Sequence, residues 1–195
     1  MPNYVNSSVR FHSINAAAVE KLNLLKQRLG EHSNFCELMY DGSFDKEEMY
    51  TRAWQHEHIG PKWTTVEEID EDGMLLTSAW SDPTMGVEWL IGELAKVDPD
   101  LVTLYTYEEE QPAFFGVYVY KGNEVYDGYE DEWDDIIFEM KNEFPEFAEA
   151  HDEDGDITDE GWEIFHENIW EFLNDNADRF ITETLEALEN GDSDG

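Results

Sequence analysis

The sequence contains a single cysteine, Cys36, and no long apolar run. One thiol excludes an internal disulfide and a cysteine-rich zinc site. Cys36 lies in the apolar stretch 34–40, which predicts an inert thiol in the core. No stretch approaches the ~20 apolar residues that span a bilayer, and no basic segment precedes an apolar one at the N-terminus. We therefore expect a soluble, intracellular protein without a membrane partner.

Basic residues are also scarce. The chain has 11 Lys and Arg against 48 Asp and Glu, a formal net charge of -37. Contacts to phosphate need Lys and Arg, so this balance opposes direct binding to nucleic acid or anionic lipid. Aromatic residues make up 14% of the sequence, whereas highly charged disordered chains are poor in them. We expect a folded acidic protein.

The negative charge is concentrated toward the C-terminus. Residues 1–64 carry 8 acidic and 7 basic side chains, a net charge of -1. Residues 65–121 carry 13 acidic and 2 basic side chains, a net charge of -11. Residues 122–195 carry 27 acidic and 2 basic side chains, a net charge of -25. An even spread would suit solubility alone, so the asymmetry favours a surface that meets a cationic partner.

Alternating apolar residues predict strands in the first two thirds of the chain. They are expected at 5–12, 101–107, 113–120 and, as a short pair, around 124–126. A hairpin is expected over 63–80, with Gly73 supplying a positive φ in its turn.

Apolar residues spaced three and four apart predict helices at 15–30, capped by Asn15, and at 84–97. Segments 34–40 and 50–56 are open between strand and short helix. The element order over residues 1–126 predicts an α+β domain, a ferredoxin-like antiparallel sheet with helices on one face.

Beyond residue 128 the apolar period becomes helical. Trp133 to Phe147 predicts one helix, and Trp162 to Leu188 predicts a longer one. Residues 127–195 should therefore form an acidic α-helical extension that packs on the first domain.

Five short segments of the first domain form one pattern. They are Met1-Pro2-Asn3, Gly60-Pro61-Lys62-Trp63, Thr77 to Pro83, Tyr105-Thr106-Tyr107-Glu108 and Phe115 to Gly122. Residues 1–126 with this pattern resemble the YubB-type ferredoxin-like domain of phage and conjugative-plasmid proteins. The resemblance implies the fold, an origin on a mobile element and a bacterial host cytoplasm. It implies no catalytic residue.

The predicted C-terminal helix carries acidic residues at a spacing of four: Glu163, Glu167, Glu171 and Asp175. Like charges at this spacing oppose helix formation, and their spacing resembles the charge density of a nucleic-acid strand within about a factor of two. The sequence predicts a non-enzymatic DNA mimic that binds the basic nucleic-acid-binding surface of a host defence protein, as anti-restriction and anti-CRISPR inhibitors do. The alternative is a solvated helix face. The residues predicted to bind the partner are Glu160, Glu163, Glu167, Glu171, Asp175, Asp178, Trp170, Asp131, Asp134 and Asp135.

Trp170 lies beside the main apolar stripe. Burial in the core is the simpler interpretation. An exposed Trp170 among carboxylates could instead stack on an arginine of the partner.

Two patterns raise the question of metal binding. The acidic loop 151–159 places Asp152, Asp154 and Asp156 as in a calcium loop, but Ala150 and Gly161 stand where two key ligands belong. We expect instead an acidic turn that caps the next helix through Thr158 or Asp159. His56 and His58, with Glu37 or His32, form a weaker candidate on a predicted strand. No cofactor is expected, and no motif indicates an enzyme.

Two alternative functions remain open. An accessory or regulatory module would bind its partner through the near-neutral ferredoxin-like face, around Phe115 or Tyr118. A divalent-metal-binding protein would use Asp152, Asp154 and Asp156. The oligomeric state is also open, but contact between copies should use the near-neutral N-terminal third.

Overall fold

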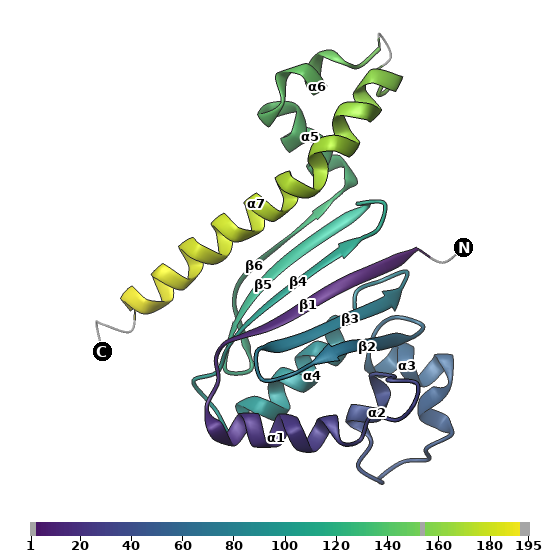
Figure 1. Cartoon of the computed structure of the whole chain (residues 1–195), viewed down its shortest axis with the longest axis vertical. Helices are drawn as coiled ribbons and strands as arrows, with labels where there is room; N and C mark the ends of the chain where they lie inside the picture. Colours follow the sequence, from purple (N-terminus) through teal and green to yellow (C-terminus); the bar gives the residue numbers. More distant parts are fainter. Residues whose placement is uncertain (1–2, 153–154, 192–195) are drawn as a thin grey trace. The chain divides into compact units, whose positions relative to one another are not determined.

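A computed structural model describes residues 3–152 and 155–191. The strands in chain order are β1 (Tyr4–Ser13), β2 (Thr64–Ile69), β3 (Gly73–Ala79), β4 (Val102–Glu109), β5 (Phe114–Lys121) and β6 (Glu124–Glu132). The helices are α1 (Ala16–Lys26), α2 (Cys36–Met39), a 3-10 turn (Glu48–Tyr50), α3 (Arg52–His58), α4 (Thr84–Ala95), α5 (Trp133–Glu143), α6 (Pro145–Glu149) and α7 (Asp159–Gly191). Figure 1 shows the elements in sequence colours.

The six strands form one sheet in the order β2-β3-β1-β4-β5-β6. β1 pairs antiparallel with both β3 and β4, and β2 pairs antiparallel with β3. The crossover through α1 joins β1 to β2, and the crossover through α4 joins β3 to β4, and β1 and β3 lie between β2 and β4. This is the predicted ferredoxin-like βαββαβ topology, extended at one edge by β5 and β6.

One face of this sheet carries the core of the N-terminal domain. Along β1 the side chains of Val5, Ser7, Val9 and Phe11 are buried while most of their neighbours are not, as alternation in a strand requires. Tyr105 lies opposite Val9 in the register and is fully buried. Its phenol oxygen accepts a hydrogen bond from the Thr84 hydroxyl at the start of α4. α1 and α4 lie side by side along this face (Figure 1).

Gly73 is required for a reason that the sequence did not indicate. It is absent from the residues with positive φ, so the predicted left-handed turn is wrong. A Cβ at Gly73 would lie 2.2 Å from the carbonyl oxygen of Val9 on the neighbouring strand. The glycine is therefore needed for close approach of β1 and β3.

Several predicted boundaries differ from the structure. α1 is capped by the Asn15 side chain as predicted, but it ends at Lys26 rather than Gly30. There Arg28 N–H bonds to Leu25 O and Leu29 N–H to Lys26 O, which tightens the last turn. Segments 34–40 and 50–56 contain short helices. β6 runs on to Glu132, well beyond the predicted 124–126, because strand pairing at the sheet edge overrides the low strand propensity of an acidic run.

The predicted helix over 133–147 is two helices. α5 ends at Glu143, and α6 begins at Pro145. Proline lacks the N–H that would continue the helix, and it disfavours helical geometry at Phe144 before it. Phe144 has an extended ψ of 94°. The break turns the chain so that α5, α6 and α7 pack around Phe147 and Phe165, whose rings are 5.9 Å apart.

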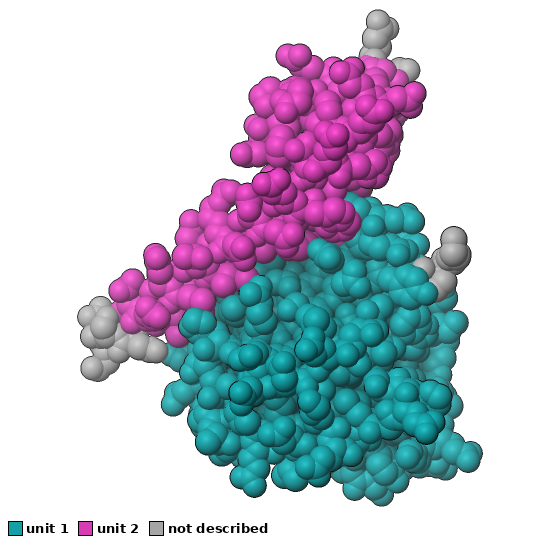
Figure 2. Space-filling model, viewed as in Figure 1, with its two compact units in different colours: residues 1–112, 116–129 teal, residues 113–115, 130–195 magenta. Residues whose placement is uncertain are grey.

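The chain divides into two compact units, coloured separately in Figure 2. Unit 1 is residues 1–112 and 116–129, and unit 2 is residues 113–115 and 130–195. That the helical segment packs on the sheet domain stays a prediction. In the described part of the chain, every helix is too short or too polar to cross a membrane.

Candidate partner-binding surface

α7 begins with a well-formed cap. The Thr158 hydroxyl accepts the N–H of Gly161 at 3.2 Å and donates to Ala150 O at 2.9 Å. Asp159 and Glu160 lie in the first turn, where negative charge interacts favourably with the helix dipole. The predicted capping role of the acidic turn is confirmed. From this cap the helix continues for 33 residues.

Two parallel rows of side chains run along α7. The buried row is Phe165, Ile169, Leu173, Ala177 and Ile181. The acidic row is Glu163, Glu167, Glu171 and Asp175, all exposed. Each row has a spacing of four, and the two are offset by two residues. Because two residues turn an α-helix by about 200°, the rows stay on opposite sides of the helix as they wind around it.

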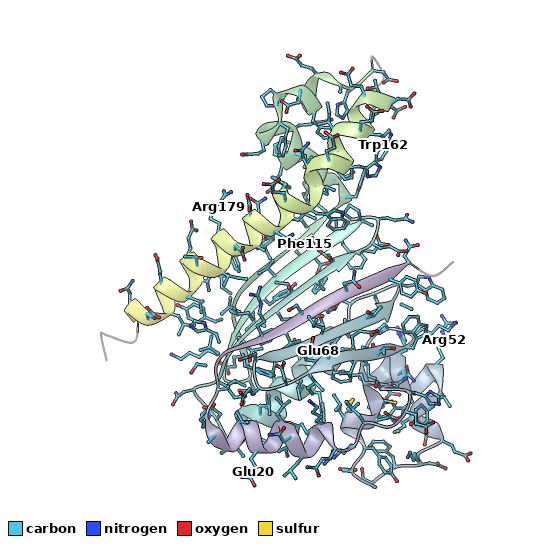
Figure 3. All side chains as sticks on the ribbon, in the orientation of Figure 1. Glu20, Arg52, Glu68, Phe115, Trp162 and Arg179 are labelled. Atoms are coloured by element: carbon cyan, nitrogen blue, oxygen red, sulfur yellow. The ribbon has the colours of Figure 1, made fainter. Side chains whose placement is uncertain are left out.

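Every acidic side chain of α7 is exposed, whatever its place in the sequence. They are Asp159, Glu160, Glu163, Glu167, Glu171, Asp175, Asp178, Glu183, Glu186 and Glu189. We call these residues the acidic face. Figure 3 shows oxygen-tipped side chains along the length of α7.

Basic residues do not neutralise this surface. Arg179 is the one basic residue of α7, and its guanidinium donates to the side-chain oxygen of Asn176 at 3.1 Å. Within the described residues, both recorded ion pairs lie in unit 1 and involve Glu93, with Lys21 at 2.8 Å and with Lys96. In the described part of the chain, no carboxylate of the acidic face therefore takes part in an ion pair.

The spacing of these carboxylates bears on what could bind them. Residues four apart lie about 6 Å apart along the helix axis. A nucleic-acid strand carries one phosphate per about 3.4 Å of axis. The row Glu163 to Asp175 alone thus has about half the linear charge density of one strand, and Glu160 and Asp178 add to it.

A hollow of about 280 Å³ interrupts the acidic face near its middle. It is lined by Glu143, Phe144, Asn168, Glu171, Phe172, Asp175, Asn176 and Arg179. The rings of Phe144 and Phe172 meet edge to face at 6.1 Å. Glu143, the last residue of α5, was not among the predicted residues. It lines the hollow because α5 packs against α7.

The three predicted aspartates before and within α5 differ in their surroundings. Asp134 is exposed. The Asp135 carboxylate accepts the backbone N–H of Glu132 at 3.4 Å and completes the capping box of α5. Asp131 is half-buried; burial, reinforced by the charges of Glu139 and Asp135, raises its pKa to about 6. Of these three aspartates, Asp134 is the one that is exposed and takes no part in the capping box of α5.

Trp170 is exposed over 37% of its surface, so core burial, the simpler interpretation, is wrong. The buried row passes through Ile169, and Trp170 lies one residue further around the helix. Its acidic neighbour on the helix surface is Glu167, three residues earlier. Trp162 is equally exposed but stacks on Trp133 at 5.9 Å.

The acidic loop before α7 is held by its own hydrogen bonds. Asp156 N–H donates to the Asp152 carboxylate at 2.9 Å, and Asp152 N–H donates to Asp156 O at 2.9 Å. Asp154 lies outside the described residues. Among the described residues, no group of three or more His, Cys, Asp and Glu side chains is placed to hold a metal ion.

The predicted strand for the histidine candidate is wrong. His56 and His58 lie on α3, where residues two apart point to nearly opposite sides. The Nδ1 atom of His56 is 2.7 Å from Gly60 O. His58 stacks on Trp54 at 4.1 Å. Glu37 is buried and accepts hydrogen bonds from Gly30 N–H and the Tyr50 hydroxyl, while His32 is exposed.

The remaining candidates, Cys36, Phe115 and Tyr118, are largely internal. Cys36 is fully buried as predicted, and burial, with the nearby Glu37 charge, raises the pKa of its thiol to about 12. Phe115 is only 3% exposed and Tyr118 is half-buried. Of the two residues that mark the alternative, near-neutral face, Tyr118 is thus the one with a partly exposed side chain.

Comparison with known proteins gave no match. No family model matches the chain, and neither the curated proteins nor the solved structures gave a significant match. The YubB-type resemblance stays a prediction from the residues quoted for it.

Proposed function

We propose that the acidic face is a nucleic-acid mimic. It occupies the basic groove of a nucleic-acid-binding protein or complex in the bacterial cytoplasm and inhibits it without catalysis. Anti-restriction and anti-CRISPR inhibitors carried by phages and plasmids are the class to which this activity belongs.

One observation carries the proposal. All ten acidic side chains of α7 are exposed, and none of them has an ion-pair partner among the described residues. Like charges at a spacing of four destabilise a helix, and a lysine at any of these positions would relieve the repulsion. A helix selected for its own stability would not keep this pattern. A basic groove that binds phosphates provides the missing counter-charges.

The exposed indole of Trp170 fits the same function. Nucleic-acid-binding grooves are rich in arginine, and guanidinium groups stack on indole rings. Trp170 and Glu167, three residues apart on the surface of α7, offer such a group both a ring and a carboxylate.

The test is capture of partners from a bacterial lysate at low salt, followed by elution with increasing salt. We expect a complex that handles DNA or RNA to be retained and released as salt rises. The purified complex should then lose binding to its own nucleic acid when this protein is added. Electrostatic association of this kind weakens steeply with salt.

A matched pair of variants separates mimicry from general acidity. The triple variant Glu163→Lys, Glu167→Lys and Glu171→Lys should abolish capture. The control reverses three exposed acids of unit 1, Glu20, Glu31 and Glu57, and makes the same change in net charge. Glu20 lies on α1 (Figure 3). Equal loss in both variants, or a partner that resists high salt, would refute the proposal.

A further inference from the structure

β6 ends the six-stranded sheet (Figure 1). One of its edges pairs with β5, and the other meets no further strand in the described part of the chain. Its first four residues, 124–127, are all exposed, although alternate side chains of a strand point to opposite faces of the sheet. Val125 is 50% exposed and Tyr126 is 45% exposed. Both faces of the sheet are therefore accessible along this stretch.

The backbone of residues 124–127 is also open along its outer edge. Among the described residues, the hydrogen bond recorded for this stretch outside the sheet is a local one, from the N–H of Gly128 to the Asp127 carboxylate at 2.9 Å. Alternate N–H and C=O groups of an edge strand point away from its neighbour, so they can pair with one more strand.

The opposite edge of the sheet is protected. There the N–H of Phe35 donates to Thr64 O on β2 at 2.9 Å, and the N–H of Val66 donates to Ser33 O at 2.7 Å. The chain thus lays its own segment 33–35 along the first half of β2. The structure describes no such cover for residues 124–127 of β6.

The side chains of the open stretch alternate in a specific order. Glu124 and Asp127 stand on either side of Val125 and Tyr126, which gives the order acidic, apolar, apolar, acidic. The three strands nearest this edge, β4, β5 and β6, carry seven acidic residues and one basic residue, Lys121. Lys121 is half-buried on β5, one strand inside the edge. The edge itself is therefore negative.

Cross-strand pairs decide which strand such an edge accepts. Opposite charges and apolar pairs stabilise a sheet, whereas like charges placed directly opposite destabilise it. A second copy of β6 would bring acids against acids. A segment with the order basic, apolar, apolar, basic sets a cation opposite both Glu124 and Asp127, and apolar side chains opposite Val125 and Tyr126. This order is the same in both directions, so it fits an antiparallel and a parallel alignment.

We infer that residues 124–127 of β6 bind an extended segment of a partner protein with the order basic, apolar, apolar, basic, which adds to the sheet as a further strand. In this mode of recognition the main-chain hydrogen bonds supply affinity, and the alternating side chains supply specificity. The inference does not rest on the acidic face of α7. That face would attract any basic peptide through its charge, whatever the order of the residues.

The test adds short peptides to the full chain. The probe is Thr-Lys-Val-Val-Lys-Thr, blocked at both ends, and its control is Thr-Val-Lys-Lys-Val-Thr, which has the same composition and charge. By calorimetry we expect the probe to bind about tenfold more tightly than the control. Amide hydrogen exchange should slow at alternate residues among 124–127, because alternate N–H groups point outward.

Two N-methylated versions of the probe test the backbone pairing. One is methylated on its odd-numbered residues and the other on its even-numbered residues. An added strand presents alternate N–H groups to the edge that it joins, so one version should lose binding and the other should keep it. Attraction by charge alone would leave both versions bound equally, and this result would overturn the inference.

A charge swap tests the side-chain order. Glu124→Lys combined with Asp127→Lys should reject the probe and bind Thr-Glu-Val-Val-Glu-Thr instead. The control, Glu20→Lys combined with Glu57→Lys, makes the same change in net charge at exposed positions of α1 and α3 and should bind the probe like the wild type.

Three further results would overturn the inference. They are equal binding of the probe and the scrambled control peptide, unchanged exchange at residues 124–127, and equal loss of the probe in both charge variants. Exchange that slows at these residues with protein concentration alone would identify a second copy as the occupant and would also overturn it. None of these measurements depends on capture of a partner by the acidic face, so the two proposals can fail separately.

Discussion

The Tyr50 hydroxyl donates a hydrogen bond of 2.6 Å to the buried carboxylate of Glu37. Glu37 is 5% exposed, and its second oxygen accepts the N–H of Gly30 at 2.7 Å. Burial, with the hydrogen bond and charge of Glu37, raises the pKa of Tyr50, so the phenol stays a donor at all ordinary pH values. A carboxylate is thus held inside unit 1 by hydrogen bonds to neutral donors.

Tyr50→Phe should destabilise the protein by about 1–2 kcal/mol, because a buried carboxylate oxygen loses a donor. The midpoint of urea unfolding measures the loss. Tyr126→Phe is the control, since Tyr126 is 45% exposed on the edge strand β6. An unchanged midpoint for Tyr50→Phe would show that water replaces the phenol at Glu37.

Gly73→Ala should destabilise the protein by about 3 kcal/mol, the upper end of the usual cost of overpacking, because the Cβ meets backbone. Its Cβ would lie 2.2 Å from Val9 O, and neither atom belongs to a flexible side chain. Gly92→Ala is the opposite case within the same unit. Gly92 lies inside α4 with open space around it, so alanine there should stabilise by about 0.5–1 kcal/mol. Thermal unfolding should show a lower melting temperature than the wild type for Gly73→Ala and a higher one for Gly92→Ala.

The contrast between these glycines illustrates what the sequence could predict. The helix cap at Asn15, the hairpin and the exposed acidic row could be predicted from the sequence. Each of them depends only on residue spacing within one helix or on the residues of one turn. The role of Gly73 depends on β1, which lies more than 60 residues away in sequence, and no local pattern contains it. Glu143 and Glu171 line one hollow because α5 packs against α7, which is a tertiary contact that no local pattern contains. The left-handed conformation of Trp80, whose φ is +68°, has no signature in the sequence, because the hydrogen bond from its N–H to Asn3 O is tertiary.

Asp131→Asn should stabilise the protein near neutral pH and have little effect near pH 4. The folded-state pKa of Asp131 is raised from 3.8 to about 6, chiefly by burial and then by Glu139 and Asp135. The folded state therefore holds a proton that the unfolded state has lost, and stability falls as pH rises from about 4 to about 6. Because the group is partly solvated, we expect a gain of about 1 kcal/mol for asparagine at pH 7. Urea unfolding at both pH values measures it; an equal gain at pH 4 would mean that charge is not the cause.

Glu167→Lys should raise stability and lower affinity for the partner at the same time. Glu167 lies four residues from both Glu163 and Glu171, so lysine turns two like-charge pairs into two attractive ones. Each such change contributes a few tenths of a kcal/mol, about 1 kcal/mol in total at low salt. Glu167→Gln removes the repulsion alone and should fall between lysine and the wild type in both properties. The three stabilities should converge at about 1 M salt, where the Debye length is about 3 Å. If the wild type binds its partner most tightly but is the least stable of the three proteins, the carboxylate at position 167 serves partner binding and lowers the stability of the helix. If lysine improved stability and left partner binding intact, the carboxylate at 167 would serve only solubility.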